Sequence, residues 1–230
     1  MDILPFYGGA VLKKMPTAVI FDMDGVIFDT ERVYLDSCVS AAGELGLGDV
    51  QKLCISCIGV TEEVTKKRFA EAIPDPELCA RFWETARSKT RETLSRGMPV
   101  KEGARELLQK LYTEGIPTAL ASSTRTETVI RELISVDLFG FFTRIVGGDM
   151  VSRSKPDPEI FLKAADMLGV PGQECLVLED SKNGLLSAKA AGMTVYIIPD
   201  LVPIDDEMKE KADMILPSLA DVWSELKKDA

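Results

Sequence analysis

Short apolar runs alternate with amphipathic helical patterns along most of this chain. Runs rich in β-branched and aliphatic residues predict strands, and they lie at Thr17–Phe21, Pro117–Ala121, Arg144–Val146, Cys175–Glu179, Thr194–Ile198 and Met214–Leu216. Several of these runs are apolar throughout, which is typical of strands buried on both faces of a sheet. Because helical patterns separate the strands, we predict an α/β fold with a Rossmann-like core around a parallel sheet.

The alternation stops between residues 31 and 96, where no strand pattern occurs. Tyr34, Cys38, Ala41 and Leu45 recur at helical spacing, and three further helical segments follow through Ser95. We therefore predict a smaller all-helical cap domain at residues 31–96, with residues 1–30 and 97–230 forming the α/β core. An insert after the first strand would lie where ligands bind in open α/β sheets.

Composition narrows the classes of function. The net charge of -10 argues against a nucleic-acid or acidic-membrane partner, because such binding needs a positive surface. The chain has no histidine, so acid–base chemistry must use carboxylates, Lys, Tyr or Cys. Its five cysteines predict reduced thiols in a cytoplasmic protein. Residues 1–14 precede the first strand, and we expect them to be a dispensable extension.

The first predicted strand runs directly into the sequence FDMDGVIFDTE at Phe21–Glu31. Asp22 and Asp24 place two carboxylates at the end of that strand, where they repel unless a cation or a shared proton separates them. Gly25 permits a sharp turn that brings backbone close to a ligand. Taken alone, the pattern is also that of an acidic turn that ends a strand.

Two later motifs carry groups that suit an anion. ALASSTR ends a strand in Ser122 and Ser123, and hydroxyls with backbone N–H groups at a helix start form an anion site. Helix capping also explains these residues. SKPDPEIF puts Lys155 in the loop before a helix, where it either neutralises a phosphate oxygen and a carboxylate or is a solvated surface lysine.

The last motif, CLVLEDSKNGLLSAKAAG, ends an apolar strand in Glu179 and Asp180. Paired acids after a buried strand are costly unless they bind a cation. Together with Asp22 they form an oxygen-rich cluster that suits Mg²⁺ better than zinc or copper.

Four strand ends thus carry Asp-x-Asp, Ser/Thr, Lys and Glu-Asp in that order, with a helical insert after the first. This order resembles the haloacid dehalogenase superfamily, and more narrowly its branch of helical-cap phosphatases and β-phosphoglucomutase-like proteins. The resemblance covers nearly the whole chain from Thr17. It implies a phosphoric monoester hydrolase: a Mg²⁺-dependent phosphatase that hydrolyses a small phosphorylated metabolite, such as a sugar phosphate, through an aspartyl-phosphate.

The resemblance also implies a role for each motif residue. Asp22 would be the nucleophile, Asp24 the acid and then the base, and Lys155 would orient Asp22. The Mg²⁺ ligands would be Asp22, the backbone carbonyl of Asp24 and Asp180, with Glu179 as a direct or water-mediated supporter. Ser122 and the N–H of Ser123 would hold the phosphate, with Gly25 in the same phosphate-binding group.

Two alternatives to hydrolysis stay open. A β-phosphoglucomutase-type isomerase would return the phosphoryl group to a second sugar hydroxyl. Members that resemble that mutase carry a histidine in the first cap helix, whereas this stretch reads DTERVYLDS, which counts against the mutase. A non-catalytic sensor of a phosphorylated ligand on the same fold is the other alternative.

Substrate choice is expected to depend on the cap. Lys66, Lys67 and Arg68 lie in IGVTEEVTKKRF, and Arg125 follows the phosphate motif; these four residues are candidate substrate contacts. The cap residues equally fit an exposed cationic helix face, with Glu62 four residues before Lys66. We expect a monomer, because a moving lid needs room to open.

Overall fold

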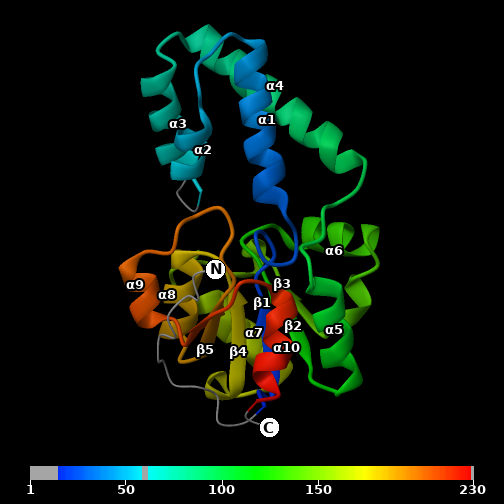
Figure 1. Ribbon diagram of the computed structural model, residues 1–230. Coiled ribbons are helices and arrows are strands. Elements are labelled where there is room, and N and C mark those ends of the chain that lie inside the picture. Colours follow the sequence, from blue (N-terminus) through cyan, green and yellow to red (C-terminus); the bar gives the residue numbers. More distant parts are fainter. Residues whose placement is uncertain (1–14, 59–61, 229–230) are drawn as a thin grey trace. The chain divides into compact units, whose positions relative to one another are not determined.

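The computed structural model describes residues 15–58 and 62–228 of the chain (Figure 1). The chain forms two compact units: one runs to Phe28 and resumes at Val100, and the other is Asp29–Pro99. The expected extension at residues 1–14 lies outside the described residues. The predicted domain boundaries stay a prediction, because compactness alone does not test whether each unit folds independently.

The first unit is built on a six-stranded parallel sheet in the order β3-β2-β1-β4-β5-β6. The strands are β1 (Ala18–Phe21), β2 (Thr118–Ala121), β3 (Arg144–Val146), β4 (Cys175–Glu179), β5 (Thr194–Ile197) and β6 (Met214–Ile215). Each predicted strand is present with its ends shifted by one residue at most, so the predicted α/β fold is confirmed. Phe21 pairs with Leu120 and Leu178, which brings the carboxyl ends of β1, β2 and β4 to one level.

Helices cover both faces of this sheet, as buried parallel strands require. The helices of this unit are α5 (Ala104–Thr113), α6 (Thr126–Ser135), α7 (Glu159–Leu168), α8 (Lys182–Ala190), α9 (Asp206–Lys211) and α10 (Leu219–Leu226), with short 3₁₀ turns at Phe139–Phe141, Gly148–Met150 and Gly172–Glu174. Helices α7, α8 and α9 share one buried cluster with alternate strand residues such as Ile20 and Val177. The intervening Val19 and Leu176 point to the opposite face and are also fully buried.

Four helices make up the described part of the second unit: α1 (Thr30–Glu44), α2 (Gln51–Ser56), α3 (Glu62–Ala72) and α4 (Pro76–Ser95). Helix α4 begins where Asp75 accepts hydrogen bonds from the N–H groups of Glu77 and Leu78, with Pro76 in the first turn. Its Phe82 stacks on Phe69 of α3 with ring centroids 5.2 Å apart. Buried aromatic packing therefore holds α3 and α4 together.

None of the described helices is long and apolar enough to cross a membrane. The cytoplasmic location expected from the cysteine content stays a prediction.

Candidate active site

The carboxyl ends of the central strands carry the side chains that the motifs singled out. Asp22 follows β1, Ser122 follows β2, and Glu179 ends β4 with Asp180 directly after it. The Asp22 N–H donates to the carbonyl of Leu178 at 3.0 Å, so the β1–β4 pairing continues to the nucleophile candidate. Each of these carboxylates and the Ser122 side chain is buried. Positions next to a rigid sheet give them a fixed geometry.

Lys155 is the centre of the site. Its ammonium donates to Asp22 Oδ1 at 2.5 Å and to Glu179 Oε1 at 2.7 Å, with the carbonyl oxygen of Ala121 at 3.3 Å. The side chain is 8% exposed, and its Nζ lies 4.7 Å from the centre of the Phe161 ring. Of the two readings of Lys155, the solvated surface lysine is therefore wrong, because this ammonium is buried between two acids.

Glu179 is fully engaged by the chain. Its Oε2 accepts from the Asp180 N–H at 2.9 Å, the Ser181 N–H at 2.8 Å and the Ser181 hydroxyl at 2.9 Å, while Oε1 takes Lys155. Gly184 in the first turn of α8 leaves room for this carboxylate, since a Cβ at that position would collide with it. The positive end of α8 adds to its stabilisation. This arrangement fixes the position of Lys155.

Three of these buried acids lie close together. Asp22, Glu179 and Asp180 each offer an oxygen, and the three oxygens lie within 4.8 Å of one another. Three ionised carboxylates against the one ammonium leave an excess of two negative charges in a buried place, which is costly. Burial raises the pKa of Asp22 to about 8; Lys155 opposes this shift, and Glu179 adds to it. A divalent cation would balance the charge, so the donor set fits Mg²⁺.

The turn after β1 brings its backbone against Asp180. Gly25 has a φ of +82°, and a Cβ there would collide with the Asp180 carboxylate. Asp24 is partly exposed, and the hydroxyl of Thr124 donates to its Oδ2 at 3.4 Å. The structure therefore brings Gly25 and Asp24 to the same strand ends as Asp22.

The Ser/Thr motif after β2 forms a tight loop. Ser122 is buried, and its Oγ accepts from the Thr124 N–H at 3.0 Å, which leaves the Ser122 O–H available as a donor. Ser123 is exposed. At the start of α6, Asp149 accepts from both the N–H and the hydroxyl of Thr126 at 2.7 Å. The carboxylate of Asp149 thus occupies part of the helix start at which the motif predicted an anion site.

The four candidate substrate contacts lie in different surroundings. Lys66 is exposed and lines a cavity of the second unit, and Lys67 is exposed. Arg68 donates to the backbone carbonyl of Ser56 and so links α3 to α2. Arg125 is exposed at the start of α6. Contact of any of them with substrate stays a prediction.

Three residues that support this site were not among those predicted from the sequence. Ser181, Gly184 and Asp149 hold Glu179 and the start of α6. The Ser-x-x-Gly spacing after the acidic pair was a usable signal, because it places a capping hydroxyl three residues before a glycine inside a helix. Asp149 offered no such signal, since its partner Thr126 lies 23 residues away.

Comparison with known proteins identifies the class of this enzyme. A sequence profile of the haloacid dehalogenase-like hydrolases matches residues 19–198 of the 230. The chain belongs to this family, as the order of its motifs predicted.

Individual relatives show the kind of hydrolase. The "Phosphorylated carbohydrates phosphatase" of Thermotoga maritima is 34% identical over 176 residues, which are 76% of this chain and 82% of that protein. The "Probable pseudouridine-5'-phosphatase" of Drosophila melanogaster is 34% identical over 217 residues, covering 92% of this chain and 93% of that protein. These names agree with the prediction of a phosphoric monoester hydrolase.

A solved structure is similar over both units. The crystal structure titled "putative beta-phosphoglucomutase from Thermotoga maritima" matches with a TM-score of 0.76 and 30% identity. The match covers 92% of this chain and 98% of that one. One similar structure therefore carries the name of the alternative function, a β-phosphoglucomutase.

Proposed function

We propose that this protein is a Mg²⁺-dependent phosphatase that hydrolyses a small phosphorylated metabolite through an aspartyl-phosphate on Asp22. The observation that carries this proposal is the contact of Lys155 with both Asp22 and Glu179 inside a buried cluster of carboxylates. Such a cluster is stable when a divalent cation balances its excess negative charge. The phosphatase names of the relatives support the same class of substrate.

The cation would be held by Asp22, Asp180 and the backbone carbonyl of Asp24, with Glu179 as a supporter. When bound, Mg²⁺ would neutralise negative charge on the phosphate oxygens during transfer. Glu179 uses both of its oxygens within the chain, so its main contribution is to position Lys155.

Two chemical steps follow for the side chains. First, the Asp22 oxygen that Lys155 does not hold attacks phosphorus, the bond to the leaving oxygen breaks, and Asp24 gives that oxygen its proton. Second, a water oxygen attacks phosphorus, Asp24 takes a proton from that water, and the bond to Asp22 breaks. The Ser122 hydroxyl and the Ser123 N–H would donate to the phosphate oxygens throughout.

Lys155 has a defined task in both steps. Burial lowers the pKa of this lysine, but the neighbouring Asp22 and Glu179 carboxylates outweigh that effect and raise it above its usual range. It therefore stays a cation and holds Asp22 Oδ1 in place while the other oxygen reacts. Orientation of this kind removes much of the entropic cost of the reaction.

A β-phosphoglucomutase-type isomerase is the second candidate, because the similar structure from Thermotoga maritima carries that name. A mutase must keep the phosphoryl group on the aspartate until a second sugar hydroxyl accepts it. The stretch Asp29–Ser37 lacks the histidine of the mutase branch, and so we favour hydrolysis.

A phosphate-release screen over phosphorylated metabolites with Mg²⁺ tests the proposal. We expect turnover of at least one sugar phosphate or similar ester, and its loss in Asp22→Asn with an unchanged circular dichroism spectrum. β-Glucose 1-phosphate belongs in the screen: glucose 6-phosphate without released phosphate would support the mutase. Release that persists in Asp22→Asn would refute this nucleophile, and ligand binding without any turnover would favour the sensor.

A further inference from the structure

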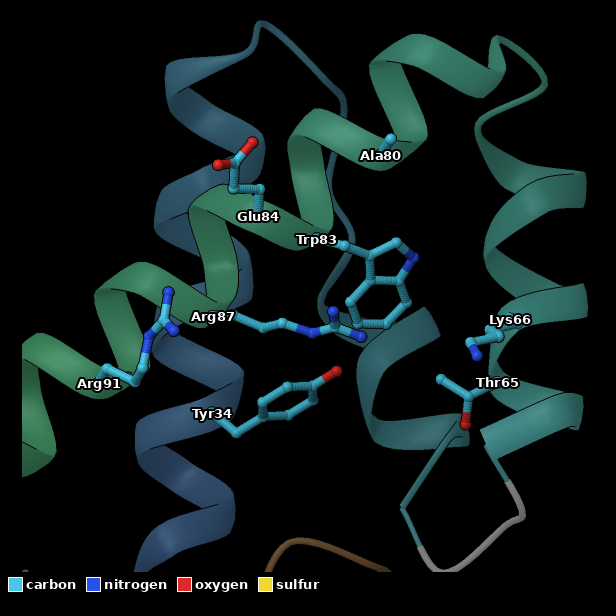
Figure 2. A pocket seen from close by; sticks show the side chains of 8 residues that line it. All are labelled: Tyr34, Thr65, Lys66, Ala80, Trp83, Glu84, Arg87 and Arg91. Carbon is cyan, nitrogen blue, oxygen red and sulfur yellow. The ribbon is translucent and has the colours of Figure 1, made fainter.

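The second unit contains a cavity of about 720 Å³ between helices α1, α3 and α4 (Figure 2). It is lined by Tyr34 of α1, by Thr65 and Lys66 of α3, and by Ala80, Trp83, Glu84, Arg87 and Arg91 of α4. Its volume is in the usual range of small-molecule sites, which is about 300–1,000 Å³. All of its walls belong to one compact unit, so the cavity is a property of that unit alone.

The lining is more positive than its surroundings. Lys66, Arg87 and Arg91 face one acid, Glu84, which makes three positive charges and one negative, or +2. Residues 29–99 as a whole carry 10 Lys and Arg against 12 Asp and Glu, or -2. Figure 2 shows the Glu84 carboxylate pointing away from the Trp83 ring and the Arg87 guanidinium. Positive charge concentrated in a concave place of an acidic protein favours an anion.

The two arginines are open to a ligand. Neither Arg87 nor Arg91 forms an ion pair within the described part of the chain, and both are exposed. With Trp83 they recur every four residues along α4, which places all three on one face of the helix. Guanidinium groups bind carboxylate and phosphate oxygens in pairs, and so suit the charged end of a small ligand.

An aromatic wall lies beside these charges. The Trp83 ring is braced by the buried Phe69 and Phe82, with centroid distances of 4.5 and 5.4 Å, and the guanidinium of Arg87 lies 6.0 Å from its centre. In Figure 2 the Arg87 guanidinium lies between the rings of Trp83 and Tyr34. Burial and the neighbouring Cys38 thiol raise the pKa of Tyr34, so this side chain is an uncharged aromatic ring beside the cations. A braced aromatic surface suits a flat ring.

We propose that this cavity binds a small organic anion that carries a flat unsaturated ring. Arg87 and Arg91 take its charged group, and Trp83 and Tyr34 take its ring. Nucleoside monophosphates and aryl phosphates have this chemistry. The phosphate of an ester that is hydrolysed binds at Asp22, so an anion whose charged group lies on Arg87 and Arg91 is an effector and not the substrate.

Fluorescence of Trp83 tests the proposal without any turnover. The chain has two tryptophans, so Trp223→Phe leaves Trp83 as the only one. In that full-length protein with Asp22→Asn, we would titrate uridine 5′-monophosphate, adenosine 5′-monophosphate and phenyl phosphate, and compare the ring-free ribose 5-phosphate and glycerol 3-phosphate. We expect a saturable change in emission with at least one ring-bearing anion, and at least tenfold weaker binding of both ring-free ones.

Matched variants locate the binding. Loss of one charge-assisted hydrogen bond in Arg87→Gln should raise Kd about tenfold or more. Arg81→Gln removes an exposed arginine of the same helix outside the cavity and should change Kd by less than twofold. The proposal is overturned if no ring-bearing anion changes Trp83 emission at millimolar concentration, or if Arg87→Gln and Arg81→Gln bind equally well.

Competition tests the assignment as an effector. The ring-bearing anion should bind together with an ester that the phosphate-release screen identifies as a substrate. Mutually exclusive binding of the two would overturn the assignment. Absence of phosphate release with intact Trp83 titration would remove the proposed function and leave this binding site standing.

Discussion

Two groups of cationic side chains differ sharply in their exposure. Lys155 lies at the carboxyl ends of the central strands, and Arg87 and Arg91 lie in the second unit. Lys155 is 8% exposed and lies between two carboxylates within 2.7 Å. Arg87 and Arg91 are exposed and line an open cavity. A buried ion pair is held in one arrangement, because any other arrangement would leave a charge without a partner in the protein interior. An exposed arginine can adjust to its ligand, which suits recognition better than chemistry.

The largest effect is expected from removing the buried charge. Lys155→Met should lower kcat/KM at least a thousandfold, because Asp22 loses its orienting partner. It should also lower the free energy of unfolding by about 3 kcal/mol, since two buried acids lose their positive partner. Urea denaturation and steady-state kinetics measure both.

Arg87→Gln is the matched change in the other unit. Its free energy of unfolding should stay within about 0.5 kcal/mol of the parent, as for most exposed positions. Equal destabilisation by Lys155→Met and Arg87→Gln would contradict the expected difference between a buried, paired cation and an exposed one. If Lys155→Met does not fold, Lys155→Arg keeps the charge and should recover stability but not the full rate.

The metal site gives the next largest effect. The parent should gain about 2.7 kcal/mol of stability at a Mg²⁺ concentration of 100 times Kd. Asp180→Ala should lose most of that gain and need at least tenfold more Mg²⁺ for activity, because it removes one ligand. Thermal unfolding with and without Mg²⁺ checks this, with the fully exposed Asp206→Asn as control. A normal Mg²⁺ response in Asp180→Ala would exclude it as a ligand.

Two glycines inside helices, one crowded and one in open space, should respond to alanine with smaller and opposite changes in stability. Gly184 in α8 touches Glu179, whereas Gly43 in α1 has open space where a Cβ would be. Gly184→Ala should cost about 1–3 kcal/mol through overpacking and should slow turnover, because Glu179 and Lys155 must shift. Gly43→Ala should raise stability by about 0.5–1 kcal/mol. Chemical denaturation measures the free energy of unfolding of both variants. A Gly184→Ala variant more stable than Gly43→Ala would refute the crowding assigned at Gly184.

The smallest effect is expected at an exposed ion pair. Glu92 and Arg96 in the second unit are 65% and 75% exposed and pair at 2.5 Å. Glu92→Gln should change the free energy of unfolding by about 0.5 kcal/mol or less, because solvent screens the pair. A loss comparable to that of Lys155→Met would show that exposure is a poor guide to the value of a charge in this protein.

Much of the core could be predicted from local sequence. The strands next to Asp22, Ser122 and Glu179 are apolar throughout, so their ends are easy to locate. Parallel strands put their carboxyl ends at one edge, and this brings together residues about 160 positions apart, such as Asp22 and Asp180. The contact between Lys155 and Asp22 was implied only by the family resemblance, because Lys155 lies in a loop well beyond the end of β3 at Val146.

The second unit was harder to predict. Its four helices could be expected from periodicity and from the prolines around Asp75, but not which side chains share a space. Tyr34, Lys66 and Arg87 meet at the cavity from three different helices. Their positions depend on how α1, α3 and α4 pack, and amphipathic patterns leave that packing undetermined.

The sequence by itself determined the α/β class, the six strands and the order of the polar groups at their ends, because these follow from short runs of neighbouring residues. Only the tertiary structure decided that Lys155 is buried between Asp22 and Glu179 and that Gly184 makes room for Glu179. It also decided that a positive aromatic cavity lies in the second unit. The physical reason is that burial and close approach depend on the packing of distant segments, which local patterns do not encode.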